Sequence, residues 1–156
     1  MVSDNTVAAD LTSELSTRLS DVADETVRRA IAAPLVQFNE ARAGPSGNRP
    51  LVVELRSAEG VIGGLWGNTA YGWLFIQLLA VPTELHRHGW GRRLMSEAEE
   101  EARNRGCHSA WLDTFEFQSR GFYERLGYSC FATLPEYPKG FSRYFLCKRL
   151  GGVGEG

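Results

Sequence analysis

The hydrophobic and polar positions at the start of the chain follow two different periods. Residues 15–20 alternate, a period of two that predicts a half-buried first strand. A stretch of helical composition follows and is expected to run from Asp24 to about Ala43, with Pro34 able to kink or divide it. Glycine and proline in residues 44–48 predict the loop that ends this helix.

From residue 51 onward, short apolar runs separated by turn residues are typical of strands. We expect strands at 51–57 and 61–66, an interruption at 67–68 and then a long strand at 71–81. Pro82 lacks a backbone N–H for a sheet ladder, so the long strand should end there. The short connections between these strands predict an antiparallel meander.

The second half of the chain alternates between helical and strand patterns. Apolar residues recur at every fourth position from Trp90 to Ala102, which predicts an amphipathic helix ending at Gly106. Beyond it we expect a strand at 107–114, a short helix at 119–126 and strands at 128–133 and 141–149. Together these elements predict a mixed α/β domain of the α+β type. Its mostly antiparallel central sheet is flanked by helices, with one helical crossover after the long strand.

The length and composition favour one folded domain. The chain has 156 residues, of which 43% are hydrophobic and 23% are charged, close to the average for soluble globular proteins. We expect the domain at residues 13–150, between flexible tails at 1–12 and 151–156. The longest apolar run, Trp73 to Val81, is far shorter than the roughly 20 residues of a membrane-spanning helix. No basic segment followed by an apolar one opens the chain, so a cytoplasmic location is the default expectation.

The charge and the cysteine content narrow the classes of partner. The net charge of −2, without a recurring aromatic and basic pattern, makes nucleic acid a poor candidate partner. Cys107, Cys130 and Cys147 lie far apart and are expected to be small buried hydrophobic residues rather than metal ligands. His86 and His88 form an isolated His-x-His pair with no evident third ligand, so no metal is expected.

The segment His86–Gly91 lies between a predicted buried strand and the amphipathic helix. Exposed backbone N–H groups and the helix dipole favour an anion at such a junction, and two glycines let a ligand approach the backbone closely. Arg92 and Arg93 follow in the first turn, where cations oppose the dipole unless a negative group such as a diphosphate is bound. A solvated turn with ordinary surface arginines is the alternative that spacing alone leaves open. The segment lacks the third glycine of a dinucleotide fingerprint and the Gly-Lys-Ser/Thr of a P-loop.

Two segments resemble a known family. Gly89 and Gly91 open a helix after a strand ending in Leu-x-Val, which resembles the cofactor-binding segment Gln/Arg-x-x-Gly-x-Gly/Ala of the GNAT superfamily of N-acetyltransferases. His86 occupies the Gln/Arg position. Residues 121–128, Gly-Phe-Tyr-Glu-Arg-Leu-Gly-Tyr, resemble the family's Tyr-Glu-Lys-Leu-Gly-Phe signature. The resemblance covers roughly residues 15–150 and implies the GNAT-like acyl-CoA N-acyltransferase fold.

The resemblance also implies that acetyl-CoA is the cosubstrate. In the family, the strand before the loop splays from its neighbour, and its free backbone groups pair with pantetheine and polarise the thioester carbonyl. The matching positions here are Leu79, Ala80 and Val81, and the other implied cofactor-binding positions are His86, Arg87, His88, Gly89, Trp90, Gly91 and Arg92. Tyr123 matches the family tyrosine that protonates the departing thiolate, because a phenol with a pKa of about 10 is protonated at neutral pH.

The general base is left open by the sequence. Gln77 lies where several family members carry a glutamate, and an amide cannot usefully accept the proton. Glu116, Asp113 and Glu54 are candidates to act directly or through water, although each is also suited to a structural or surface position.

The acceptor site is expected near strand ends, with Glu116, Phe117 and Trp73 as substrate-binding residues. Two aromatic residues alternate with an acid in Phe115-Glu116-Phe117, a pattern suited to a cationic amine. The sequence therefore predicts direct acetyl transfer to a primary amine of a small molecule. A non-catalytic acyl-CoA sensor and a protein or peptide N-acetyltransferase are the alternatives. A homodimer formed through an exposed strand edge also stays open.

Overall fold

The structure is a computed structural model that describes residues 15–151. The chain divides after Gly44 into two compact units, and each is described by itself. The predicted N-terminal tail at 1–12 lies outside the described residues, as does all of the predicted C-terminal tail except Gly151. The predicted boundaries of a single domain at 13–150 therefore stay a prediction.

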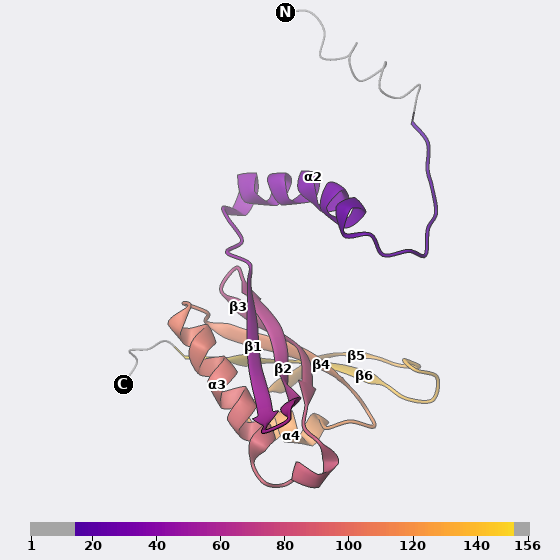
Figure 1. The fold of residues 1–156 in the computed structure, drawn as a ribbon. Coiled ribbons are helices and arrows are strands. Elements are labelled where there is room, and N and C mark those ends of the chain that lie inside the picture. Colours follow the sequence, from indigo (N-terminus) through magenta and orange to yellow (C-terminus); the bar gives the residue numbers. More distant parts are fainter. Residues whose placement is uncertain (1–14, 152–156) are drawn as a thin grey trace, which may run out of the picture. The chain divides into compact units, whose positions relative to one another are not determined.

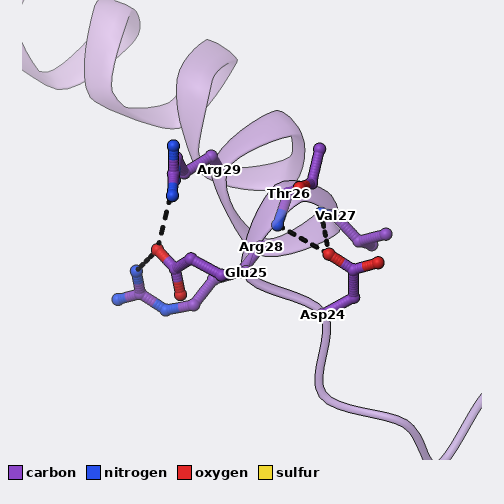
Figure 2. Close-up of polar contacts among 6 residues, drawn as sticks. All are labelled: Asp24, Glu25, Thr26, Val27, Arg28 and Arg29. Carbon is purple, nitrogen blue, oxygen red and sulfur yellow. Dashed lines mark hydrogen bonds and ion pairs between the residues drawn. The ribbon is translucent and has the colours of Figure 1, made fainter.

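The N-terminal unit contains one long helix, α2 (Glu25–Ala43). Asp24 caps its amino end, because one carboxylate oxygen accepts hydrogen bonds from the backbone N–H groups of Thr26 and Val27, at 2.7 and 3.4 Å (Figure 2). Glu25 adds a negative charge in the first turn, where the helix dipole favours it. The predicted helix is confirmed, with its start and end at the expected residues.

The predicted first strand at 15–20 is wrong. These residues form neither strand nor helix, and their side chains are exposed. An alternating pattern forms a strand only where a neighbouring strand accepts its backbone hydrogen bonds, and the described sheet contains no strand from this segment. Pro34 lies inside α2 and does not divide it.

The unit that begins at Pro45 is built on a six-stranded sheet (Figure 1). Its strands are β1 (Arg49–Ser57), β2 (Gly60–Ala70), β3 (Trp73–Ala80), β4 (Ser109–Phe115), β5 (Ser129–Leu134) and β6 (Arg143–Arg149). The spatial order is β1-β2-β3-β4-β6-β5, in which β3 and β4 run parallel and the other neighbours are antiparallel. The predicted mixed, mostly antiparallel sheet is confirmed.

Three helical segments connect these strands. They are the 3₁₀ turn η1 (Thr83–Leu85), the crossover helix α3 (Trp90–Asn104) and the short helix α4 (Arg120–Arg125). α3 packs on one face of the sheet over β1, β2 and β3 (Figure 1). The fully buried α3 side chains Leu94, Met95, Ala98 and Ala102 form one core with strand residues that include Leu51, Leu65, Leu74 and Leu112. The predicted amphipathic pattern is therefore confirmed as the core-facing side of α3.

The turn between β2 and β3 lies later than the sequence indicates. The expected interruption at 67–68 falls inside β2, and the turn is formed by Tyr71 and Gly72 with φ values of +50° and +75°. Two successive positive φ values are typical of a tight two-residue hairpin turn. Gly67 has a different role, because a Cβ there would lie 2.2 Å from the carbonyl oxygen of Phe75 on β3.

Candidate active site

The parallel pair β3 and β4 separates partway along its length. The ladder joins Trp73–Ile76 to Ser109–Leu112 and then ends. Beyond that point, β3 continues beside β2 and β4 continues beside β6. The last four residues of β3 therefore direct part of their backbone N–H and C=O groups toward a gap rather than toward β4. Leu79 and Ala80 lie in this segment.

A β-bulge marks the point of separation. The β2–β3 register pairs Gly67 with Ile76 and Trp66 with Leu78, which leaves Gln77 as the extra residue. Bulges bend a strand and re-aim its side chains, and they are common beside active sites. The exposed Gln77 side chain lies where the sequence resemblance placed a candidate base, and its amide cannot serve as one.

The loop after β3 is held in shape by its own histidines. His86 Nε2 lies 2.9 Å from the carbonyl oxygen of Val81, and His88 Nδ1 lies 2.8 Å from the carbonyl oxygen of His86. A carbonyl only accepts hydrogen bonds, so each of these ring nitrogens carries the hydrogen. Arg87 and Gly89 adopt positive φ values of +65° and +84°. His86, at the family's Gln/Arg position, thus closes the loop back onto the end of β3.

The amino end of α3 offers free hydrogen-bond donors. The first helical hydrogen bond runs from the Arg93 N–H to the Gly89 carbonyl, at 3.0 Å. The N–H groups of Trp90, Gly91 and Arg92 precede it and have no backbone acceptor among residues 15–151. Gly89 has no side chain to cap them, and the first turn contains no acidic residue. Three unpaired donors at the positive end of a helix fit a diphosphate.

The arginines around this helix end have different partners. Arg93 forms an ion pair with Glu97 at 2.9 Å, and its guanidinium lies 5.5 Å from the Trp90 ring centroid. Arg87 and Arg92 are exposed and form no ion pair within the described part of the chain. Of the three arginines, these two have charges that are available to an anion at the start of α3.

Gly91 brings α4 close to the start of α3. A Cβ on Gly91 would lie 3.2 Å from the edge of the Phe122 ring, tighter than ordinary van der Waals contact. The Phe122 ring in turn lies 5.1 Å from that of Tyr123, edge to face. The absence of a side chain at Gly91 therefore allows α4, which contains Tyr123, to pack against the start of α3.

Tyr123 combines a buried ring with a reachable oxygen. Only 8% of the residue is exposed, yet its hydroxyl forms no hydrogen bond with the described residues. No fully buried side-chain polar atom in the described segment lacks a partner, so the Tyr123 oxygen must border accessible space. Burial, reinforced by the negative charge of Asp113, raises the pKa of Tyr123 to about 12. At neutral pH the phenol is thus a neutral proton donor.

This raised pKa predicts a late step in an alkaline titration. Because the pKa is higher in the folded protein, the protonated phenol contributes stability that is complete below pH 10 and is lost as the pH rises toward 12. The difference in phenolate absorbance between the wild type and Tyr123→Phe should therefore rise near pH 12. A difference that rises near pH 10, while near-ultraviolet circular dichroism still shows folded protein, would contradict the assigned environment.

The three candidate bases all have structural partners. Asp113 accepts a hydrogen bond from Arg143 Nε at 2.7 Å, and Glu54 pairs with Arg56 on the same strand. Glu116 accepts a hydrogen bond from the Ser142 backbone N–H at 2.8 Å. Asp113 and Glu116 thus link segments that are distant in the chain, whereas Glu54 forms only an exposed ion pair within β1.

The predicted acceptor residues do not all meet. Glu116 and Phe117 follow the carboxyl end of β4, whereas Trp73 pairs with Ser109 at the amino end of that strand. At roughly 3.3 Å per residue, these two places lie ~20 Å apart along β4. The structure therefore brings Glu116 and Phe117 to the same end as the β3–β4 gap and leaves Trp73 at the other end.

A buried ionic cluster is centred on Glu99 of α3. Glu99 on α3 is 4% exposed and accepts hydrogen bonds from Tyr128 Oη at 3.0 Å, Lys148 Nζ at 2.7 Å and Arg103 at 3.3 Å. The Tyr128 ring lies 6.2 Å from that of Tyr123. Helix periodicity alone does not predict this buried charge, because its partner Lys148 comes 49 positions later in the chain.

Residues 15–151 contain no group of three or more His, Cys, Asp or Glu side chains arranged to hold a metal ion. None of their helices is long and apolar enough to span a membrane. All three cysteines are free; Cys107 is buried as expected, whereas Cys130 and Cys147 are half-buried.

Comparison with known proteins agrees with this geometry. The profile of the acetyltransferase (GNAT) family matches residues 15–128. The chain is 44% identical to Acetyltransferase Atu2258 of Agrobacterium fabrum over 133 residues, which cover 85% of this chain and 97% of that protein. It is 39% identical to the blasticidin-S acetyltransferase of Streptomyces morookaense, covering 65% of this chain and 79% of that protein. The crystal structure of an acetyltransferase from Agrobacterium tumefaciens has a TM-score of 0.81 at 43% identity, covering 86% and 99% of the two chains.

The chain therefore belongs to the GNAT family of acetyltransferases. It has the family's fold and is an acetyl-CoA-dependent acetyltransferase. The expectation of an enzyme, drawn from the two sequence motifs, is confirmed, and the non-catalytic alternative is set aside.

Proposed function

We propose that this enzyme transfers the acetyl group of acetyl-CoA directly to a primary amine of a small molecule. One arrangement supports the proposal: the start of α3, with its free N–H groups, follows the open end of β3 and approaches Phe122, the neighbour of Tyr123, at Gly91. The relative named blasticidin-S acetyltransferase supports an acceptor that is a small molecule rather than a protein.

The diphosphate of the cosubstrate would be held at the start of α3. The N–H groups of Trp90, Gly91 and Arg92 would donate hydrogen bonds to the diphosphate oxygens. The guanidinium groups of Arg87 and Arg92 would neutralise the diphosphate charge. The other loop residues would act indirectly. The His86 and His88 rings hydrogen-bond to backbone carbonyls and so fix the loop conformation, which requires the positive φ of Gly89. We assign the pantetheine arm to the open edge of β3 at Leu79, Ala80 and Val81, which follows the strand end.

The reaction needs few side chains. Acetyl-CoA supplies an activated acetyl group as a thioester. A backbone N–H of β3 would donate to the carbonyl oxygen as negative charge develops there during attack by the neutral amine. Tyr123 holds a proton on its oxygen and would donate it to the sulfur as the carbon–sulfur bond breaks. The proton lost by the amine would leave through water, and water would return a proton to the Tyr123 oxygen after the coenzyme A thiol has formed.

A panel of amines tests the acceptor class. Polyamines, aminoglycosides, amino acids, nucleoside-type amines and peptide N-termini would be incubated with acetyl-CoA, and coenzyme A release and product mass would be recorded. We expect the highest kcat/KM for a small primary amine. If peptide N-termini or protein lysines were preferred at every concentration, the small-molecule assignment would be wrong and the protein alternative would replace it.

The cofactor loop is tested by a matched pair of glycines. Gly89→Ala places a side chain at φ +84°, which costs about 1–2 kcal/mol and distorts the loop, so we expect coenzyme A to bind about tenfold more weakly. Gly106 at the other end of α3 has φ +83°, and neither Cβ would meet an atom within 4 Å. Gly106→Ala should therefore lose similar stability and keep its affinity in calorimetry. If both variants lost the same affinity for coenzyme A, the loop that contains Gly89 would not be its binding site.

A further inference from the structure

Four aromatic side chains at the carboxyl end of β4 form one connected group, the aromatic cluster. Its members are Phe115, Phe117, Tyr137 and Phe141. The Phe115 and Phe117 rings are stacked at 5.2 Å, Phe117 meets Phe141 edge to face at 5.1 Å, and Phe115 meets Tyr137 at 5.8 Å. The cluster thus joins the β4–α4 connection to the β5–β6 loop.

Hydrogen bonds fix these two segments to each other. Glu116 donates its N–H to the Ser142 carbonyl at 2.8 Å, and its carboxylate accepts from the Ser142 N–H at 2.8 Å. Within the β5–β6 loop, the Tyr137 N–H donates to the Phe141 carbonyl at 2.9 Å. The cluster is therefore preformed. Glu116 thus links the two segments, and its role as a substrate-binding acid stays a prediction.

The charge beneath the cluster is neutralised. The Arg143 guanidinium lies 4.9 Å from the ring centroids of both Phe115 and Tyr137. Asp113 pairs with the same guanidinium, and both side chains are mostly buried. The cluster thus presents flat ring surface without a free charge behind it.

The outer members of the cluster are exposed. Phe117, Tyr137 and Phe141 expose 56%, 46% and 44% of their surface. Scattered apolar residues on a surface are ordinary, but these three exposed rings are linked through Phe115 into one contact surface. Exposed aromatic rings suit a flat ring system better than a flexible aliphatic chain, because the faces and edges of aromatic rings attract one another.

The cluster is linked to the proposed proton donor through Gln118 and Asp113. The Gln118 side chain accepts from the Phe115 N–H at 2.8 Å and closes the turn that leads into α4, where Tyr123 follows. Asp113, which pairs with the arginine beneath the cluster, is also the charged group that acts on Tyr123. An amine that attacks a thioester beside Tyr123 would place its remaining atoms toward this surface.

We infer that the aromatic cluster is the acceptor-recognition surface and that it binds a planar aromatic or heteroaromatic ring carried by the amine substrate. The inference rests on the proposed function and names its acceptor class. Phe117 stacks against the ring, Phe141 and Tyr137 border it, and Arg143 and Glu116 hold these side chains in place.

Pairs of amines that differ only in ring saturation test the inference. Each aromatic amine is compared with a saturated analogue of similar amine basicity, for example 3-phenylpropylamine with 3-cyclohexylpropylamine, at saturating acetyl-CoA. Two ring contacts predict a kcat/KM about tenfold higher for the aromatic member. In Phe117→Leu and Phe141→Leu the preference should fall to about twofold or less, with an unchanged KM for acetyl-CoA.

Phe131→Leu is the matched control. Phe131 on β5 is 59% exposed and packs near Phe145, outside the cluster, so its replacement should leave the aromatic preference unchanged. A wild type without aromatic preference, or a preference that survives both cluster variants, would overturn the inference. So would the absence of turnover with every aromatic amine while coenzyme A still binds, and in that case the cofactor site would stand. Failure to bind coenzyme A would instead count against the proposed function itself.

Discussion

Tyr123→Phe is expected to lower the turnover number about 100-fold or more, while the dissociation constant for acetyl-CoA changes by less than about twofold. The ring keeps its packing against Phe122 and Tyr128, so the variant loses only the hydroxyl. A positioned general acid contributes roughly 10²–10⁴ in rate, and the hydroxyl has no structural hydrogen bond to lose among the described residues. Steady-state kinetics and calorimetry give the two quantities separately.

Tyr71→Phe serves as the control for this experiment. Tyr71 lies in the β2–β3 turn, is 44% exposed and is remote in the sequence from both motifs. Its replacement should leave turnover unchanged. A Tyr123→Phe enzyme that turns over as fast as the wild type would remove Tyr123 from the proposed mechanism, whatever the cofactor affinity.

Glu99→Ala is expected to reduce the free energy of unfolding by about 3 kcal/mol. Removing one member of a buried ion pair costs roughly 3–5 kcal/mol, because the remaining charges lose their partner. The lower end applies here, since the Lys148 and Arg103 side chains keep 22% and 30% exposure and regain some hydration. Tyr128 also loses the acceptor of its buried hydroxyl. Denaturant unfolding monitored by tryptophan fluorescence measures the change.

Glu100→Ala provides the matched comparison. Glu100 is the next residue of α3 and is exposed, so its replacement should change stability by about 0.5 kcal/mol or less. If the two variants were equally stable, the buried cluster around Glu99 would not exist as described. Because Tyr128 contacts Tyr123, we also expect Glu99→Ala to lower activity more than Glu100→Ala at temperatures where both are folded.

The part of the site that the sequence predicted is built from the backbone and from neighbours along the chain. The two glycines, Gly89 and Gly91, and the start of α3 lie within a few residues of one another, so their spacing carries the geometry directly. The same holds for α4, whose C-terminal Gly127 has φ +91° as expected for a helix end. The helix at 25–43 was predicted for a similar reason, since Asp24 and the loop after it are local signals.

What the sequence could not predict depends on residues far apart in the chain. Glu99 and Lys148 meet only because α3 packs over the sheet, and the aromatic cluster exists only because Ser142 returns to Glu116. Periodicity also misjudged residues 15–20, because alternation describes a strand's faces but does not supply its partner. The proposed cofactor side of the site is thus local in the chain and predictable, whereas the proposed acceptor surface is assembled by the fold.

The most direct test of the account is an amide NMR titration of the protein with coenzyme A. We predict that the backbone N–H signals of Gly89, Trp90, Gly91 and Arg92 shift strongly and saturate together with the calorimetric binding curve, because these donors would acquire a diphosphate partner. Signals at the opposite end of α3, including Gly106, should move little. Saturable binding that leaves the amides from Gly89 to Arg92 unshifted would contradict the central claim that the amino end of α3 holds the cosubstrate.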